Sequence, residues 1–142
     1  MEKIAIITDS CSDLKEEYRK ENNIFVLPIQ ISCDGKTYRD GIDIYSKEIY
    51  QLQKEHMLKT SSPVGQELFS LLESLKVNGY SHVIGIFLSA GISGTSNQMR
   101  LFCQSQEDLV CHIIDSKSAS VGLGLIAIEL AHYCQKGVTF EQ

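Results

Sequence analysis

Hydroxyl-bearing residues gather in a short turn in the middle of the chain. The turn Ser89–Thr95 follows the apolar run Ile84–Leu88 and leads into Met99–Cys103, which can be helical. The start of a helix offers free backbone N–H groups and the positive end of the helix dipole, so an anion can bind there. The alternative is that Ser93 or Thr95 only caps the helix while the glycines only turn the chain.

The same arrangement recurs elsewhere in the chain. Ile4–Ile7 runs into the polar turn Thr8–Asp13, and Val110–Ile114 runs into Asp115–Ser118. A further polar stretch, Thr60–Pro63, opens an amphipathic segment. In an open parallel sheet the carboxyl ends of the strands lie at one edge, and ligands bind there. We therefore expect these polar turns to converge on one crevice, which helix capping alone does not explain.

The composition indicates a globular protein. A chain of 142 residues is one domain or one large fragment, and its hydrophobic fraction of 43% and charged fraction of 22% are ordinary for a folded domain. The net charge is −5 and no basic run occurs, which argues against a nucleic-acid surface. No secretory segment follows the first residues and no apolar run approaches the length of a membrane span, so we expect a cytoplasmic protein.

The cysteines do not suggest a disulfide framework or a zinc site. There are five, an odd number, and no pair has C-x-x-C spacing. Cys33, Cys111 and Cys134 stand in apolar settings and are interpreted as small core residues. Unpaired cysteines suit a reducing compartment.

Strand and helix signals alternate after an early hairpin. The dipeptide Asp34-Gly35 is a strong hairpin signal, and it joins 29–33 to 36–39. Lys59–Ser62 is predicted to be a polar loop, with Ser62 and Pro63 as the N-cap and first residue of the next helix. We predict an α/β fold: a parallel sheet in a three-layer domain with helices on both faces, and a small antiparallel β-hairpin after the second strand. The expected strands are 3–7, 24–33 with an interruption at Pro28, 82–88 and 109–114, and the expected helices are 14–21, 48–55, 64–77, the segment after 91 up to 105, and 119–135.

Three features of the sequence could carry catalytic or cofactor chemistry. Gly91–Thr95 departs from the G-x-S-x-G elbow at its last position and has no clear histidine partner. Gly122–Ala127 matches G-x-G-x-x-A, but it lies too far from the preceding strand, so its glycines more simply allow close helix packing. Asp9 and Asp115 could form a cation site or act as bases, although hydrogen bonding to their own turns is favoured.

With these motifs in view, the chain resembles the DegV family of bacterial fatty-acid-binding proteins. The resemblance extends over all 142 residues. It rests on segments in the family's order and spacing: Ile7–Ser10, Leu27-Pro28, Asp34–Gly41, Thr60–Pro63, Ser89–Thr95 and Ile114–Gly124.

The resemblance implies a two-domain protein of about twice this length, of which residues 1–142 form the first, α/β domain. The lipid would lie between the domains, and the C-terminal lipid-covering domain is absent from this chain. The fatty-acid carboxylate would meet Thr60 and Ser93. The protein would perform no catalysis itself but would present the carboxylate to a partner fatty-acid kinase, which makes acyl phosphate from ATP.

These observations give one leading hypothesis and two rivals. We expect a non-enzymatic protein that binds a long-chain fatty acid through hydroxyls and helix-start amides, without a metal or cofactor. The rivals are an enzyme acting on a phosphorylated or acyl small molecule in the same crevice, with Asp9 or Asp115 as base, and a nucleotide-binding module that uses Gly122–Ala127. The predicted carboxylate ligands are Thr60, Ser61, Ser93, Gly94 and Thr95, with Ser10, Ser116 and Ser118 as possible secondary contacts.

Overall fold

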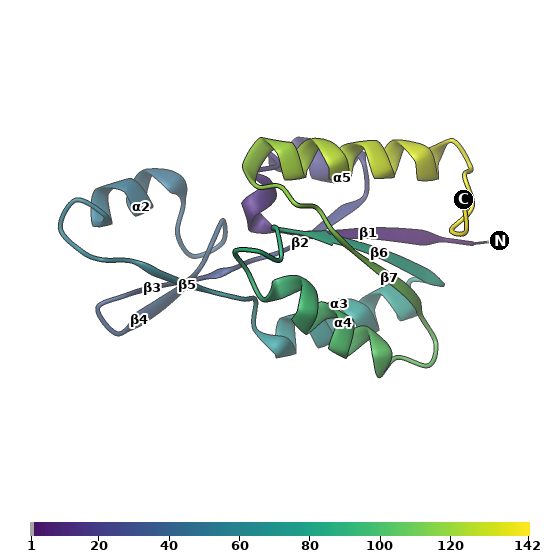
Figure 1. The fold of residues 1–142 in the computed structure, drawn as a ribbon, viewed down its shortest axis with the longest axis horizontal. Helices are drawn as coiled ribbons and strands as arrows, with labels where there is room; N and C mark the ends of the chain where they lie inside the picture. The colour runs from purple at the N-terminus through teal and green to yellow at the C-terminus, as the bar shows by residue number, and fades with distance from the viewer. Residues whose placement is uncertain (1) are drawn as a thin grey trace.

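The apolar runs of the sequence form one parallel sheet. A computed structural model describes residues 2–142. Its four-stranded sheet has the order β2-β1-β6-β7, and every neighbouring pair is parallel (Figure 1). Because the strands are parallel, their carboxyl ends lie at the same edge of the sheet, as predicted. The strands are β1 (Ile4–Asp9), β2 (Ile24–Leu27), β6 (His82–Phe87) and β7 (Val110–Asp115).

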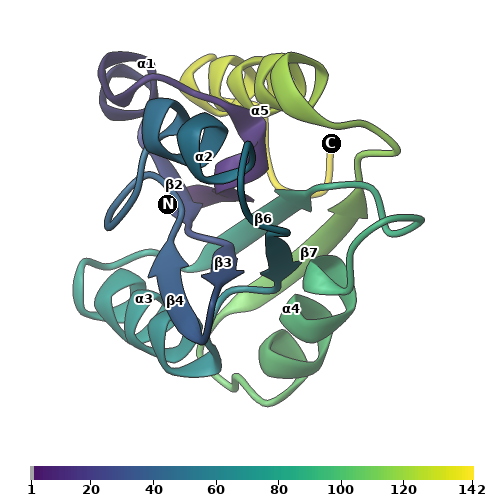
Figure 2. The same cartoon turned by 90° about the vertical axis from the view of Figure 1, so that its left-hand side faces the viewer.

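Helices cover both faces of this sheet, which confirms the predicted three-layer α/β architecture. Helices α3 (Gly65–Val77) and α4 (Thr95–Gln104) lie on one face. Helices α1 (Glu16–Glu21) and α5 (Ser120–Gln135) lie on the other (Figure 2). None of the helices within residues 2–142 has the length and hydropathy needed to cross a membrane.

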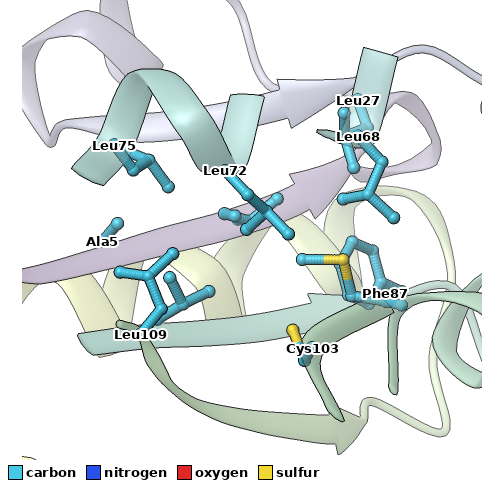
Figure 3. Close-up of a cluster of buried hydrophobic side chains, with 11 residues drawn as sticks. Ala5, Leu27, Leu68, Leu72, Leu75, Phe87, Cys103 and Leu109 are labelled. Atoms are coloured by element: carbon cyan, nitrogen blue, oxygen red, sulfur yellow. The ribbon is translucent and has the colours of Figure 1, made fainter. Parts of the chain in front are cut away.

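The larger core cluster lies between the sheet and α3 and α4. The amphipathic stripe of α3 places Leu68, Leu72 and Leu75 in this cluster, against Ala5 and Phe87 of the sheet (Figure 3). Full burial of such a side chain is worth roughly 1.5–3 kcal/mol. Leu71, a fourth leucine of this helix, is only partly buried and packs against the cluster. This cluster therefore holds α3 and α4 against the same face of the sheet.

The second core cluster lies under α5. Leu123 and Ala127 are buried there, whereas the neighbouring Ile126 is 37% exposed. A Cβ on Gly124 would lie only 2.5 Å from the Ser12 carbonyl oxygen. The glycines of the G-x-G-x-x-A stretch thus include one that a close helix contact requires, as the packing interpretation predicted.

A second, smaller sheet lies at one end of the molecule, away from the chain termini (Figure 1). Strands β3 (Gln30–Cys33) and β4 (Lys36–Arg39) form the predicted hairpin. Its turn residues Asp34 and Gly35 both have positive φ, 48° and 78°, as a type I′ turn requires. The helix α2 (Ser46–Leu52) follows the hairpin.

The prediction of a polar loop at Lys59–Ser62 was wrong. Residues Lys59–Ser61 form β5, which pairs antiparallel with β3 and makes the small sheet three-stranded. The segment is polar and exposed, so it lacks the apolar alternation that would reveal a strand. Its order comes from hydrogen bonding to β3.

Several helix boundaries also differ from the predictions. Helix α3 begins at Gly65 with Val64 as its N-cap, so Ser62 and Pro63 do not start it. The predicted helix 14–21 begins two residues later, as α1 at Glu16, and a 3₁₀ turn that was not predicted, η1 (Ser10–Ser12), precedes it. Asp9 caps η1 by accepting a hydrogen bond from the Cys11 N–H. Helix α2 ends at Leu52, short of the predicted end at residue 55, and the structure starts it at Ser46.

Candidate functional site

The polar turns converge at the carboxyl edge of the parallel sheet. The Ser89 N–H donates to the Ser118 carbonyl oxygen at 3.0 Å, which joins the turn after β6 to the turn after β7. The Ser10 hydroxyl, after β1, accepts from the Ile29 N–H at 3.1 Å. The turns after β1, β6 and β7 are therefore fixed by contacts among strand ends and turns, not left as independent loops.

Two carboxylates hold these turns in place. The Leu88 N–H donates to Asp9 Oδ2 at 2.8 Å, and the Cys11 N–H donates to Asp9 Oδ1 at 2.9 Å. Asp115 Oδ1 accepts from the N–H groups of Ala90 at 3.1 Å and Lys117 at 3.0 Å. Both aspartates thus bond to backbone turns, as favoured from the sequence. Asp9 has both of its oxygens engaged and is not placed as a free base.

The electrostatics of the two aspartates differ. Burial raises the pKa of Asp9, although the hydrogen bonds from Leu88 and Cys11 oppose this effect. The hydrogen bonds from Ala90 and Lys117 lower the pKa of Asp115. Burial, with the Asp9 carboxylate as the next cause, raises the pKa of the nearby Cys11 thiol to about 12. This thiol therefore stays protonated at neutral pH and does not act as a thiolate nucleophile.

The secondary candidates have structural partners. The Ser116 hydroxyl donates to the Phe87 carbonyl oxygen at 2.6 Å and accepts from the Ser118 N–H at 3.1 Å. Ser118 contributes its carbonyl oxygen to the contact with Ser89. Together with the Ser10 bond to Ile29, these contacts show how the three serines secure the turns.

The primary candidates meet at the start of α4. Ser93 Oγ lies 2.9 Å from Thr95 Oγ1, and the Thr95 N–H donates to Ser93 Oγ at 3.2 Å. Thr95 Oγ1 lies 3.3 Å from Ser62 Oγ and can donate to it. We call Ser62, Ser93 and Thr95 the hydroxyl cluster. Thr95 is buried, whereas Ser62 and Ser93 are half-buried.

Hydroxyl protons can be counted in this cluster. Three hydroxyl groups carry three protons, and each of the two hydroxyl–hydroxyl contacts uses one of them. One hydroxyl proton is therefore free to be donated outside the cluster. Among residues 2–142, no hydrogen-bond acceptor is recorded for the backbone N–H groups of Gly94, Ser96 and Asn97 at the start of α4. The cluster and the helix start together offer donors to a negatively charged group.

Ser62 is the member that sequence reasoning did not place in the site. It was interpreted as a helix cap, but it contacts Thr95, and the neighbouring Pro63 carbonyl oxygen accepts from Gln98 Nε2 at 3.1 Å. These contacts tie the segment after β5 to α4. The signal available in the sequence was the run of hydroxyls at 60–62, although its partner lies 33 residues further along.

Thr60 and Ser61 lie next to this cluster in the chain. Both belong to β5 and are exposed, and they pair with Ile31 and Gln30 of β3. Alternation along a strand points their side chains to opposite faces. The structure brings Ser93, Gly94 and Thr95 close to the Ser62 hydroxyl, whereas within residues 2–142 neither Thr60 nor Ser61 has a hydrogen bond to the cluster.

The cations near the turns differ in availability. Arg39 is engaged with Asp43, whose Oδ2 lies 2.9 Å from Nε, and with Glu67, whose Oε1 lies 3.3 Å from Nη1. Lys117 is exposed in the turn after β7. Arg39 is therefore an ion-pairing residue of the small sheet, and the candidate anion site consists of neutral donors.

The fold and the site together define a class of protein: an α/β domain with a hydroxyl-lined helix start at the carboxyl edge of its parallel sheet. The family model described as "Uncharacterised protein, DegV family" matches residues 3–142. The chain belongs to the DegV family.

Similar proteins agree with this assignment. A DegV domain-containing protein of Clostridium acetobutylicum is 39% identical over 142 residues, and one of Staphylococcus aureus is 41% identical over 140 residues. They cover 100% and 98% of this chain, but each match covers 50% of the relative. The chain thus spans about half the length of these curated relatives.

Solved structures share the fold. DegV of Bacillus subtilis, described as a fatty acid binding protein, has a TM-score of 0.93 and 29% identity, with 99% of this chain and 51% of that chain covered. A fatty acid binding DegV family protein of Streptococcus agalactiae has a TM-score of 0.89 and 31% identity, with 99% and 50% covered.

Proposed function

We propose that this domain binds a long-chain fatty acid and holds its carboxylate at the hydroxyl cluster and the start of α4. The proposal rests on one observation: the hydrogen bonds among Ser62, Ser93 and Thr95 use only two of their three hydroxyl protons, so one remains available to a ligand. A carboxylate accepts a hydrogen bond from this hydroxyl and further hydrogen bonds from the free amide N–H groups of the helix start. Gly94, together with whichever of Thr60 and Ser61 faces the cluster from β5, completes the proposed set of carboxylate neighbours.

Apolar side chains beside the cluster support an acyl ligand. Ile92, directly before Ser93, is 71% exposed, and Val121 and Leu125 on one side of α5 are also exposed. The turn before α5 is joined to the turn before Ile92 through Ser89 and Ser118. Each methylene buried against such surface contributes about 0.8 kcal/mol.

A second domain completes the site in our proposal. It covers the apolar side chains and the lipid, and the matched relatives, about twice as long as this chain, leave room for it. The assembled protein is a carrier without catalysis of its own, and it presents the carboxylate to a partner fatty-acid kinase that forms acyl phosphate. The bound oxygens of Asp9 support a carrier over an enzyme that uses this residue as base.

The carboxylate contact is tested with Ser93→Ala in the purified full-length protein. Fatty acid is quantified by mass spectrometry of an organic extract, and affinity is measured by titration with a defined fatty acid. A hydrogen bond to a charged group is worth about 1.5–3 kcal/mol, so affinity should fall about 10- to 100-fold. Ser70→Ala removes an exposed hydroxyl from α3 and should leave affinity unchanged. Equal affinity of both variants would contradict the proposed contact.

The carrier role is tested separately by measuring acyl phosphate formation from ATP. The protein alone should form none, and a fatty-acid kinase subunit should form it only when the protein is present. Ser93→Ala should lower the yield at limiting fatty acid. Turnover by the purified protein without a kinase would favour the rival hypothesis of an enzyme in the same crevice.

A further inference from the structure

Three side chains with different donor atoms gather on the small sheet, outside the hydroxyl cluster. Cys33, Asp34 and His56 place one sulfur, one carboxylate oxygen and one imidazole nitrogen within 4.8 Å of one another. His56 Nδ1 lies 2.7 Å from Asp34 Oδ2. These are two consecutive residues and one distant residue, so the fold, not a spacing motif, brings them together.

Two local structures position the three residues. Cys33 is the last residue of β3 and is 6% exposed, and Asp34 is the first residue of the type I′ turn. His56 follows α2, where its N–H donates to the Leu52 carbonyl oxygen at 2.9 Å. The hairpin thus supplies two donors and the end of the α2 segment supplies the third. His56 is half-buried, which leaves one side of the group open to solvent.

The combination of donors fits a particular kind of cation. Thiolate and imidazole are ligands of Zn²⁺, whereas Mg²⁺ and Ca²⁺ prefer oxygen donors only. With bonds of about 2.0–2.3 Å to zinc, the donors of a tetrahedral site lie roughly 3.3–3.7 Å apart. The three donor atoms, all within 4.8 Å of one another, therefore lie close to this spacing.

We propose that Cys33, Asp34 and His56 bind Zn²⁺ as a three-residue site, with water as the fourth ligand. Bound zinc links the β3–β4 turn to the segment after α2. The site is separate from the hydroxyl cluster: on β3, Cys33 lies three residues beyond Gln30, the partner of Ser61. At 3.4 Å per residue this is about 10 Å along the strand.

The same residue types could also form a nucleophile, a base and an orienting carboxylate. Burial favours a metal ligand, because a cysteine with 6% exposure leaves little room for a substrate at its sulfur. Zinc, by contrast, needs access only from the side of His56 and Asp34, and Asp34 is exposed.

The test uses Co²⁺ as a spectroscopic probe of the reduced, metal-free full-length protein. Stoichiometric binding should give a thiolate-to-cobalt charge-transfer band in the near ultraviolet and visible bands of tetrahedral intensity. Added Zn²⁺ should remove both sets of bands. Cys33→Ser should abolish the charge-transfer band, and Cys134→Ser, which changes a half-buried cysteine of α5, should retain it. Absence of the band, or its loss only in the control, would overturn the proposal.

A second variant guards against misfolding of Cys33→Ser, since Cys33 is buried. His56→Gln changes a residue at the surface and should preserve the circular dichroism spectrum. Its zinc affinity, measured by competition with a chromogenic chelator, should fall by at least 10- to 100-fold. Mutation of residues that only hydrogen-bond to a metal ligand already causes a loss of this size, and His56 is itself a proposed ligand. Zinc should raise the melting temperature of the unmodified protein but not of His56→Gln. Equal zinc affinity in the two proteins would also refute the site.

Discussion

The parallel sheet and the small sheet are held together by different forces. The central strands of the parallel sheet, β1 and β6, are largely buried, and Phe87 and Leu72 are fully inaccessible in one core cluster. The small sheet has few buried apolar residues, such as Ile31 and Cys33, and several of its contacts are polar. Among these are the ion pairs of Arg39. The comparison teaches that one region depends on packing and the other on charges, turns and pairing with a neighbouring strand.

The largest expected effect comes from the packed region. Leu72→Ala removes a fully buried side chain and should lower the free energy of unfolding by about 2–5 kcal/mol, measured by urea denaturation. Leu101→Ala changes an exposed leucine on α4 and should stay within about 0.5 kcal/mol. An equal loss of unfolding free energy in the two variants would contradict the prediction that stability depends on burial of Leu72.

The second effect concerns the buried carboxylate at the edge of the packed sheet. Asp9→Asn replaces one acceptor oxygen by an NH₂ group that faces a backbone N–H, either that of Leu88 or that of Cys11. The unsatisfied buried donor should reduce the free energy of unfolding by about 1–3 kcal/mol at neutral pH. Denaturation of both proteins at several pH values measures this loss.

The pH dependence of this variant has a definite sign. The pKa of Asp9 is raised in the folded protein, so between the unfolded and folded pKa values the folded state binds more protons. The unmodified protein therefore gains stability from this group as pH falls through that window, and Asp9→Asn does not. The difference between the two proteins should widen on acidification to about pH 4, and a narrowing difference would contradict the raised pKa.

The smallest effect concerns the ion pairs of the small sheet. Hydrogen bonds from Arg39 lower the pKa of Asp43 to about 2. Because this folded pKa is depressed, the pair contributes stability above the unfolded pKa and loses it as pH falls toward about 2. Arg39→Gln should return the carboxyl pKa toward the usual value of about 3.9, measured by carbon NMR of the side chain. An unchanged titration would exclude Arg39 as the cause.

Prediction from the sequence succeeded where local signals agree with the final fold. The apolar runs predicted the parallel strands, the amphipathic segment after Thr60–Pro63 predicted α3, and Asp34-Gly35 predicted the hairpin turn. It failed at Lys59–Ser61, because a polar strand is ordered by its partner β3 and not by its own pattern. In the same way, the Ser62 contact with Thr95 joins residues that only the folded chain brings together.

The small sheet and α2 occupy the stretch between β2 and α3, so they interrupt the connection that leads from β2 to β6. During folding this connection must close as a long loop before β6 can join β1. Loop-closure entropy grows only logarithmically, by about 0.6 kcal/mol for each doubling of length. The parallel sheet can therefore accommodate this insertion with little thermodynamic penalty. The long connection instead slows folding, because β6 must find a partner strand that is distant in the sequence. A variant shortened between β2 and α3 should therefore fold faster.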